Sequence, residues 1–297
     1  MHDYTRTDLA CEWGRQSSIA GTEFFERKWS HGVWQVLRIL TPEAAGRLGR
    51  PVGEYVTVNC GKIWKLDAQA REALERTVAK LLVQLLTREV GREPDPEVSV
   101  LVVGLGNRDI TADAIGPRAI GELLVTRHLR EQMPRLFRDM ACCAVSAIAP
   151  GVLGQTGMET LEVIRGAVRA SHPDVLIVID ALAARSCERL ASTLQLSNTG
   201  ISPGAGVGNQ RHALGKKTLG VPVIALGVPT VVDSSTLVYD ALRQAGIEQV
   251  DDRLRAILEN GKRFYVSPKE ADLIAGRTAT LLAHAINRAL VGVPTLS

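Results

Sequence analysis

Two apolar runs, each followed by an aspartate, constrain the fold of this 297-residue chain more than any other feature. Residues 98–105 and 175–179 are mostly aliphatic, which is typical of parallel strands buried on both faces. Asp113 follows the first run after a short loop, and Asp180 follows the second run directly. Ligands and catalytic groups of open α/β sheets gather outside the carboxyl ends of the strands. We therefore expect the two carboxylates at one edge of a sheet, close in space although distant in the chain.

Strand and helix patterns alternate from residue 53 to residue 290. Alternating polarity predicts a strand over 53–60, and apolar residues three or four positions apart predict a helix over 67–90. Residues 1–30 are polar, and we expect irregular structure there. The alternation predicts an α/β layered fold with a mainly parallel central sheet flanked by helices. Further strands are predicted over 140–148, 193–196 and 222–226, and further helices begin at 116, at a capping pattern over 156–159, at Asp233 and at the Ser267-Pro268-Lys269-Glu270 cap.

Composition excludes several classes of function. The net charge is only +3, and no basic stripe or tail is present, so we do not expect direct binding to nucleic acid. The chain has neither a signal-peptide pattern nor an apolar stretch of about 18 residues, so we expect a cytoplasmic protein without a membrane segment. The five cysteines show no CxxC spacing and the six histidines no HxxxH spacing, so we predict neither a cysteine-based zinc site nor a histidine-rich metal centre.

The glycines near the first aspartate do not form a nucleotide site. Gly104 and Gly106 follow a predicted strand, but a dinucleotide-binding fingerprint requires a third glycine where this chain has Asp109. A P-loop ending at 215–218 would require glycine in place of Gln210. We therefore predict no nucleotide cofactor.

Taken singly, the candidate residues also have ordinary structural explanations. Asp113 stands where a turn or cap residue is common, and Asp233 precedes two serines as a helix cap does. Asp180 is harder to explain in this way, because a partly buried carboxylate is costly without a partner. The glycine-rich segment 199–209 either lets backbone approach a ligand closely or forms a flexible surface loop.

Eight segments of the chain carry a common pattern in this order: 104–107, 111–117, 149–152, 156–160, 179–183, 199–209, 227–233 and 267–270. Together they resemble the spore germination proteases, endopeptidases of endospore-forming bacteria that degrade small acid-soluble spore proteins. The resemblance implies a fold similar to that of the hydrogenase maturation proteases, whose metal-binding acids occupy the equivalent strand ends. It places the family's two essential aspartates on Asp113 and Asp180, and it implies a homotetramer in the forespore or spore core. The segment 240–264 is much shorter than in the family, so the resemblance does not extend to regulation, assembly or substrate docking there, although it still covers the acid pair.

The N-terminus carries a further part of the resemblance. Residues 6–12 read Arg-Thr-Asp-Leu-Ala-Cys-Glu. Family members are made as zymogens that remove a short propeptide autocatalytically, and the cut falls in a similar Thr-Asp-Leu-Ala-x-Glu context. Carried over, the cut falls between Asp8 and Leu9. Residues 1–8 would then be a propeptide, and residues 9–297 a single peptidase domain.

These observations lead to the hypothesis of an atypical aspartic endopeptidase without a cofactor or metal. One aspartate is ionised and deprotonates water, while the other is protonated and donates a hydrogen bond to the scissile carbonyl, because two adjacent carboxylates share a proton. A helix start near Asp113 favours ionisation there, although a coupled pair titrates as a unit. The loop residues Gly204, Gly206, Gly208 and Asn209 would line the cleft or donate N–H groups to the oxyanion.

Two alternatives stay open at this point. One is a metal-dependent peptidase of the hydrogenase-maturation type, with Asp113 and Asp180 as ligands and His212 as the nearest candidate for a third. The other is a non-enzymatic protein that binds peptides or small molecules at the sheet edge, which predicts that carboxamides can replace both aspartates without loss of function.

Overall fold

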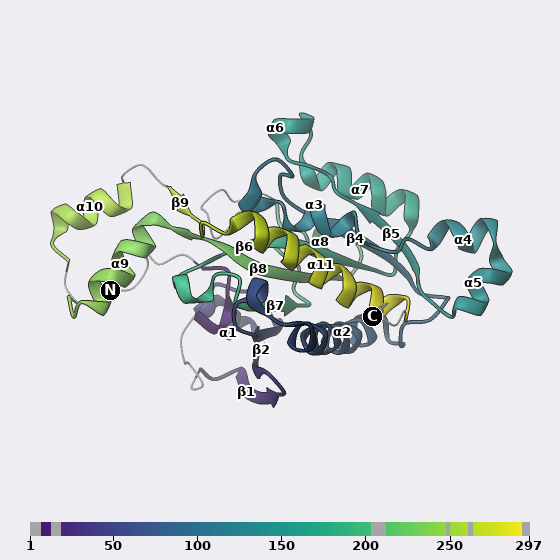
Figure 1. Ribbon diagram of the computed structural model, residues 1–297, viewed down its shortest axis with the longest axis horizontal. Helices are drawn as coiled ribbons and strands as arrows, with labels where there is room; N and C mark the ends of the chain where they lie inside the picture. Colours follow the sequence, from purple (N-terminus) through teal and green to yellow (C-terminus); the bar gives the residue numbers. More distant parts are fainter. Residues whose placement is uncertain (1–6, 13–18, 203–211, 248–249, 261–263, 293–297) are drawn as a thin grey trace.

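A computed structural model describes residues 7–12, 19–202, 212–247, 250–260 and 264–292. Within these residues, nine strands form one mixed sheet (Figure 1). Their order is β1-β2-β3-β7-β8-β6-β4-β5, and β9 pairs with β8. The strands are β1 (Thr22–Trp29), β2 (Gly32–Ile39), β3 (Gly53–Asn59), β4 (Ser99–Gly104), β5 (Ala144–Ile148), β6 (Val175–Ala184), β7 (Thr193–Ser197), β8 (Val223–Asp233) and β9 (Tyr265–Val266).

The predicted α/β layered fold is confirmed, and the sheet divides into two halves. In the parallel half, β5, β4, β6 and β8 pair in parallel. In the antiparallel half, β1, β2, β3 and β7 pair antiparallel, and β7 joins β8 in the same manner. The sequence indicated a mainly parallel sheet because the continuous apolar runs lie in the parallel half. Half-exposed strands such as β1 carry no comparable signal.

Helices cover both faces of the sheet. On one face, α2 contributes Val78 and Leu82 to an apolar cluster that also contains Ile177 of β6 and Ile286 of α11. On the other face, α7 contributes Ile164 to a second cluster. No helix among the described residues is long and apolar enough to cross a bilayer. The helices are α1 (Pro42–Leu48), α2 (Ala68–Val90), α3 (Ile115–Ile120), α4 (Arg127–Gln132), α5 (Pro134–Met140), α6 (Leu153–Thr156), α7 (Thr160–Ser171), α8 (Lys216–Leu219), α9 (Ser234–Gln244), α10 (Asp252–Asn260) and α11 (Ala271–Leu290), with 3-10 turns η1 (Ala10–Glu12), η2 (Ile63–Lys65), η3 (Thr111–Asp113) and η4 (Cys187–Arg189).

Several predicted boundaries are confirmed by their caps. Asp67 accepts the N–H of Ala70 at the start of α2, and Gly91 ends that helix in the left-handed conformation. Asp233 accepts the N–H groups of Ser235 and Thr236 at the start of α9, so it is a helix cap.

Other boundaries differ from the sequence prediction. Instead of the irregular structure expected over residues 1–30, residues 22–29 form β1, which pairs with β2 in a hairpin, because backbone pairing between half-exposed strands needs no apolar periodicity. The helix predicted from the 156–159 cap begins at Thr160, since Gly157 ends the separate short helix α6. The strand predicted from residue 140 begins at Ala144, because α5 ends at Met140.

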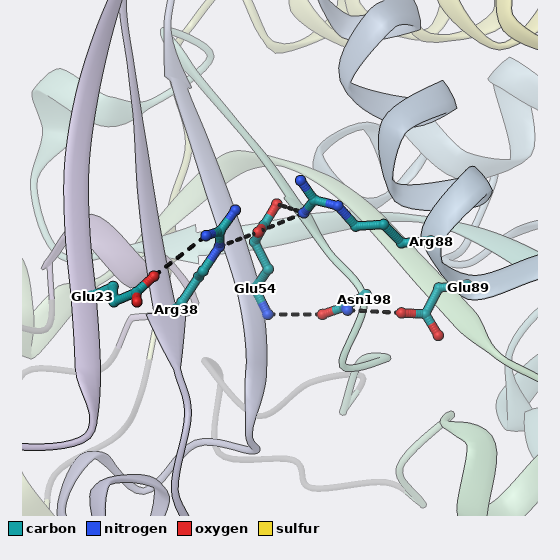
Figure 2. A network of polar contacts seen from close by, with 6 residues as sticks. All are labelled: Glu23, Arg38, Glu54, Arg88, Glu89 and Asn198. Atoms are coloured by element: carbon teal, nitrogen blue, oxygen red, sulfur yellow. Dashed lines mark hydrogen bonds and ion pairs between the residues drawn. The ribbon is translucent and has the colours of Figure 1, made fainter. Parts of the chain in front are cut away.

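A polar network ties the antiparallel half to α2 (Figure 2). The carboxylate of Glu54 on β3 accepts hydrogen bonds from Arg38 Nε at 2.6 Å and from Arg88 Nη1 at 2.7 Å. The Asn198 side chain accepts the Glu54 N–H and donates to Glu89, each at 2.8 Å. The network therefore fixes β2, β3, the end of β7 and the last turns of α2 to one another. Its members are Glu23, Arg38, Glu54, Arg88, Glu89 and Asn198.

Candidate active site

Asp113 lies in the turn η3, which connects β4 to α3. The N–H of Asn107 donates to Asp113 Oδ2 at 2.7 Å and closes the loop. The loop can fold tightly because glycines stand where its backbone segments approach one another closely. A Cβ on Gly106, which has φ of +111°, would lie 2.0 Å from the Asp113 carbonyl oxygen, and a Cβ on Gly116 would lie 2.3 Å from that of Leu105. The glycines that resembled a nucleotide fingerprint therefore serve to pack this loop.

Asp180 lies inside β6, which corrects the prediction that it stands just past the strand end. Its side chain is buried, with 7% of the residue exposed, and Oδ1 accepts the N–H of Ala181 at 2.9 Å. The strand continues to Ala184 because β8 runs beside it, pairing Asp180 with Gly227 and Ala184 with Val232. On the other side, β4 stops at Gly104, opposite Ile179. Asp180 is thus level with the end of β4.

The two acids lie at the same end of the parallel strands. The turn η3 contacts both β6 and β8, and the Thr230 hydroxyl of β8 donates to the Ala112 carbonyl at 2.7 Å. Asp180 also lines a cavity, whereas Asp113 is not among the described residues that line it.

This cavity lies over the seam between the two halves of the sheet. Gln195 of β7 pairs with Gly227 of β8, and Gly227 pairs with Asp180 of β6. Residues opposite one another in a ladder share a face, so the side chains of Gln195 and Asp180 flank a position without a side chain. The cavity has a volume of about 120 Å³, and Arg50, Tyr55 and Asp8 also line it.

The N-terminal segment forms part of the wall of this cavity through Asp8. The N–H of Asp8 donates to the Ala183 carbonyl at 2.9 Å, and the Ala183 N–H donates to Asp8 Oδ2 at 2.9 Å. Gln195 Nε2 donates to the Asp8 carbonyl at 3.0 Å, and Gln195 Oε1 accepts the Ala10 N–H at 2.6 Å. The peptide bond between Asp8 and Leu9 thus lies between β6 and the amide of Gln195.

Residues downstream of this bond are anchored more deeply. Leu9 is fully buried, and its apolar cluster includes Leu182, Ala184, Leu190 and Val232. The buried carboxylate of Glu12 accepts the Thr7 hydroxyl and the N–H groups of Arg185 and Ser186, the latter two at 2.8 and 3.1 Å. These contacts fix the register of the segment on β6.

Arg50 supplies positive charge at the upstream side. It follows α1, and its Nη2 donates to the Thr7 carbonyl at 2.6 Å. Burial lowers the pKa of Arg50, and the attraction of the Asp8 carboxylate opposes that shift. Guanidinium remains charged in proteins, so a cation faces Asp8. Burial raises the pKa of Tyr55, so its phenol stays protonated, and it donates to the Pro51 carbonyl at 3.0 Å.

The remaining predicted site residues are those of the glycine-rich loop and His212. The loop residues Gly204, Gly206, Gly208 and Asn209 lie outside the described residues. His212 is exposed. Among the residues that the structure describes, no group of three or more His, Cys, Asp or Glu side chains could hold a metal ion.

Sequence reasoning missed Gln195 and Arg50. A signal existed for Gln195, because the strand Thr193–Ser197 alternates polar and apolar residues and its polar face has to meet a polar surface. Arg50 carries no such signal, since a single arginine between a helix and a strand is common on any surface.

The sequence is similar to those of known proteases. A sequence model described as "Germination protease" matches residues 5–253. Proteins named germination protease from Clostridium perfringens (40% identity, 96% of this chain and 94% of that protein) and Bacillus subtilis (41% identity, 87% and 73%) are similar to it. Among solved structures, a NiFe hydrogenase maturation protease from Thermococcus kodakarensis matches with a TM-score of 0.33 and 16% identity, over 64% of this chain and 93% of that one.

Proposed function

Since this chain belongs to the germination protease family, whose members are endopeptidases of spore germination, we propose that it degrades small acid-soluble spore proteins and is made as a zymogen that cuts itself between Asp8 and Leu9. One observation carries this proposal. Asp8 lines the same cavity as Asp180, and hydrogen bonds hold the segment on both sides of the Asp8–Leu9 bond. A segment held in this manner has the position of a bound substrate.

The proposed mechanism uses Asp113 and Asp180 as an acid pair. One carboxylate takes a proton from a water molecule, whose oxygen attacks the Asp8 carbonyl carbon. The other carboxyl group donates a hydrogen bond to the carbonyl oxygen as it becomes negative. The carboxyl group that took the proton from water then donates it to the Leu9 nitrogen as the tetrahedral intermediate collapses and the C–N bond breaks, which leaves a new carboxyl group on Asp8 and a free amine on Leu9. The position of both acids at one end of the parallel strands supports this scheme.

The family relationship supports three further parts of the proposal. Residues 1–8 form the propeptide, and residues 9–297 form one peptidase domain. The enzyme works in the forespore or spore core as a homotetramer. The loop that contains Gly204, Gly206, Gly208 and Asn209 lines the cleft or donates N–H groups to the oxyanion.

The test compares Asp113→Asn and Asp180→Asn with Asp109→Asn, which removes an exposed carboxylate from the same loop as Asp113. Each purified full-length chain is incubated at mildly acidic pH, and its intact mass and new N-terminus are determined. We expect the unmodified chain and Asp109→Asn to begin at Leu9 after incubation. Asp113→Asn and Asp180→Asn should stay intact and leave a small acid-soluble spore protein uncut.

Two outcomes would overturn parts of this proposal. Full processing by either carboxamide variant would refute the acid pair. Loss of processing on treatment with a chelator, restored by nickel, would favour the metal-dependent alternative over an aspartic mechanism.

A further inference from the structure

We infer that Gln195 and Arg50 are the residues that recognise the cleaved peptide: Gln195 holds the scissile carbonyl, and Arg50 selects an acidic residue before the cut. This inference rests on the proposed function, because it takes the bound N-terminal segment as the first substrate. It concerns two residues outside the acid pair, and it assigns to them the contacts on either side of the scissile bond.

The amide of Gln195 brackets the scissile bond. Its Nε2 donates to the carbonyl oxygen of Asp8, the atom that becomes an oxyanion during hydrolysis, at 3.0 Å. Its Oε1 accepts the N–H of Ala10, two residues further along, at 2.6 Å. A side-chain amide carries one donor group and one acceptor, so one residue can fix the peptide on both sides of the bond. A donor aimed at a developing oxyanion stabilises the transition state more than the ground state.

The position of Gln195 in the sheet also suits this role. It stands on β7 in the ladder row that continues through Gly227 to Asp180, so it faces the same cavity as the acid. In the described part of the structure, both hydrogen bonds of its side-chain amide go to the N-terminal segment. Because Gln195 is on a central strand, its side-chain amide is positioned more precisely than a donor on a loop would be.

Arg50 accounts for an acidic residue before the cut. Its guanidinium donates to the Thr7 carbonyl at 2.6 Å and attracts the Asp8 carboxylate. The Ala183 N–H donates to the same carboxylate at 2.9 Å. An amide at position 8 would forgo the charge attraction and present an NH₂ group among donors, so the site discriminates against Asn and Gln. The apolar cluster around Leu9 then requires an aliphatic residue after the cut.

The experiment measures cleavage of two synthetic peptides by the processed enzyme. The aspartate peptide has the sequence of residues 4–14, and the asparagine peptide differs from it only by the change Asp8→Asn. The variants are Gln195→Met, which keeps the shape and removes both polar groups, Gln195→Glu, which keeps an acceptor, and Arg50→Gln. Gln35→Met on β2 and Arg47→Gln on α1 are the matched controls.

We expect the unmodified enzyme and both controls to cleave the aspartate peptide at least about tenfold more efficiently than the asparagine peptide. Gln195→Met and Gln195→Glu should lower kcat by about a hundredfold, as loss of one oxyanion donor does, with a smaller change in KM. Arg50→Gln should raise KM for the aspartate peptide and abolish the preference between the two peptides. Far-ultraviolet circular dichroism and urea unfolding establish that each variant is folded.

The outcomes separate this inference from the proposed function. If the unmodified enzyme cuts neither peptide, the proposed function fails. If it cuts the aspartate peptide and folded Gln195→Met cuts equally fast, the role of Gln195 is refuted. If Arg50→Gln keeps the preference for the aspartate peptide, the role of Arg50 is refuted. Should Gln195→Met not fold, the folded Gln195→Glu variant decides the question by the same criterion.

Discussion

The parallel and antiparallel halves of the sheet differ in burial and in what they contribute. All six residues of β4 are buried, and so are the first six of β6, whereas β1 has no buried residue. The parallel half holds Asp180 and leads into the loop of Asp113, while Gln195 and Arg50 belong to the antiparallel half and its flanking segment. We infer that the more buried half positions the acids and anchors the peptide along β6. The more exposed half adds the side chains of Gln195 and Arg50, which contact the peptide around the scissile bond. The cavity lies where the two halves meet.

The largest expected contrast is in stability. Ile177→Ala removes a fully buried side chain from β6, while Leu37→Ala removes a half-buried one from β2. We expect the first substitution to lower the free energy of unfolding by about 2–5 kcal/mol, and the second by only about 1 kcal/mol, because less area is lost and less of a cavity forms. Urea unfolding measures both values. Equal losses would show that the halves do not differ in packing.

A smaller effect is expected at the seam itself. A Cβ on Gly227 would lie 2.6 Å from the Leu182 side chain, so Gly227→Ala should force Leu182 to move and disturb the site of Leu9. We expect a loss of about 1–3 kcal/mol of stability together with slower self-processing. Gly276→Ala in α11 meets no atom within 4 Å and should instead stabilise the protein by about 0.5–1 kcal/mol. Normal self-processing of Gly227→Ala would show that the site accommodates a side chain at this position between Asp180 and Gln195.

The network in Figure 2 should contribute about 1 kcal/mol to holding the antiparallel half on α2. The Glu54 side chain is only 12% exposed, but its arginine partners are a third to a half exposed, so solvent screens the pairs. Glu54→Gln should lower the free energy of unfolding by that amount at low salt and by less at about 1 M salt. Glu131→Gln, which breaks an exposed pair with Arg127, should change it little. A loss at Glu54 that is independent of salt would contradict an electrostatic role.

The smallest contrast concerns thiol reactivity. Burial raises the pKa of Cys60, after β3, and of Cys143, before β5, to about 12 in each case. Thiolate forms only as pH approaches the pKa, so at pH 9 about 0.1% of each thiol is reactive. We expect Cys187, which is exposed, to react with a thiol reagent first, and we expect Cys60 and Cys143 to remain unreactive until the protein unfolds. Fast reaction of Cys60 alone would show that the antiparallel half opens more readily.

The sequence predicts the parallel half better than the antiparallel half for a physical reason. Continuous aliphatic runs identify β4 and β6, because strands covered on both faces need apolar residues throughout. The length of β6 beyond Asp180 depends on β8 alongside it, which no local pattern contains. The β1–β2 hairpin depends on backbone pairing between polar strands. For the site, the two acids can be predicted because each follows a strand that the sequence identifies. The roles of Gln195 and Arg50 cannot be predicted in this way, because they depend on which strands lie side by side in the sheet.

The early end of β4 has a consequence for the physical state of any substrate. Beyond the end of β4, the Asp8 N–H donates to the Ala183 carbonyl of β6, and the Asp8 carbonyl and the Ala10 N–H bond to Gln195. A chain can make such backbone hydrogen bonds only when its own N–H and C=O groups are not engaged in a helix or another sheet. Segments that are helical or folded must therefore melt locally before they are cut. The enzyme should distinguish proteins by their local unfolding free energy as well as by their sequence.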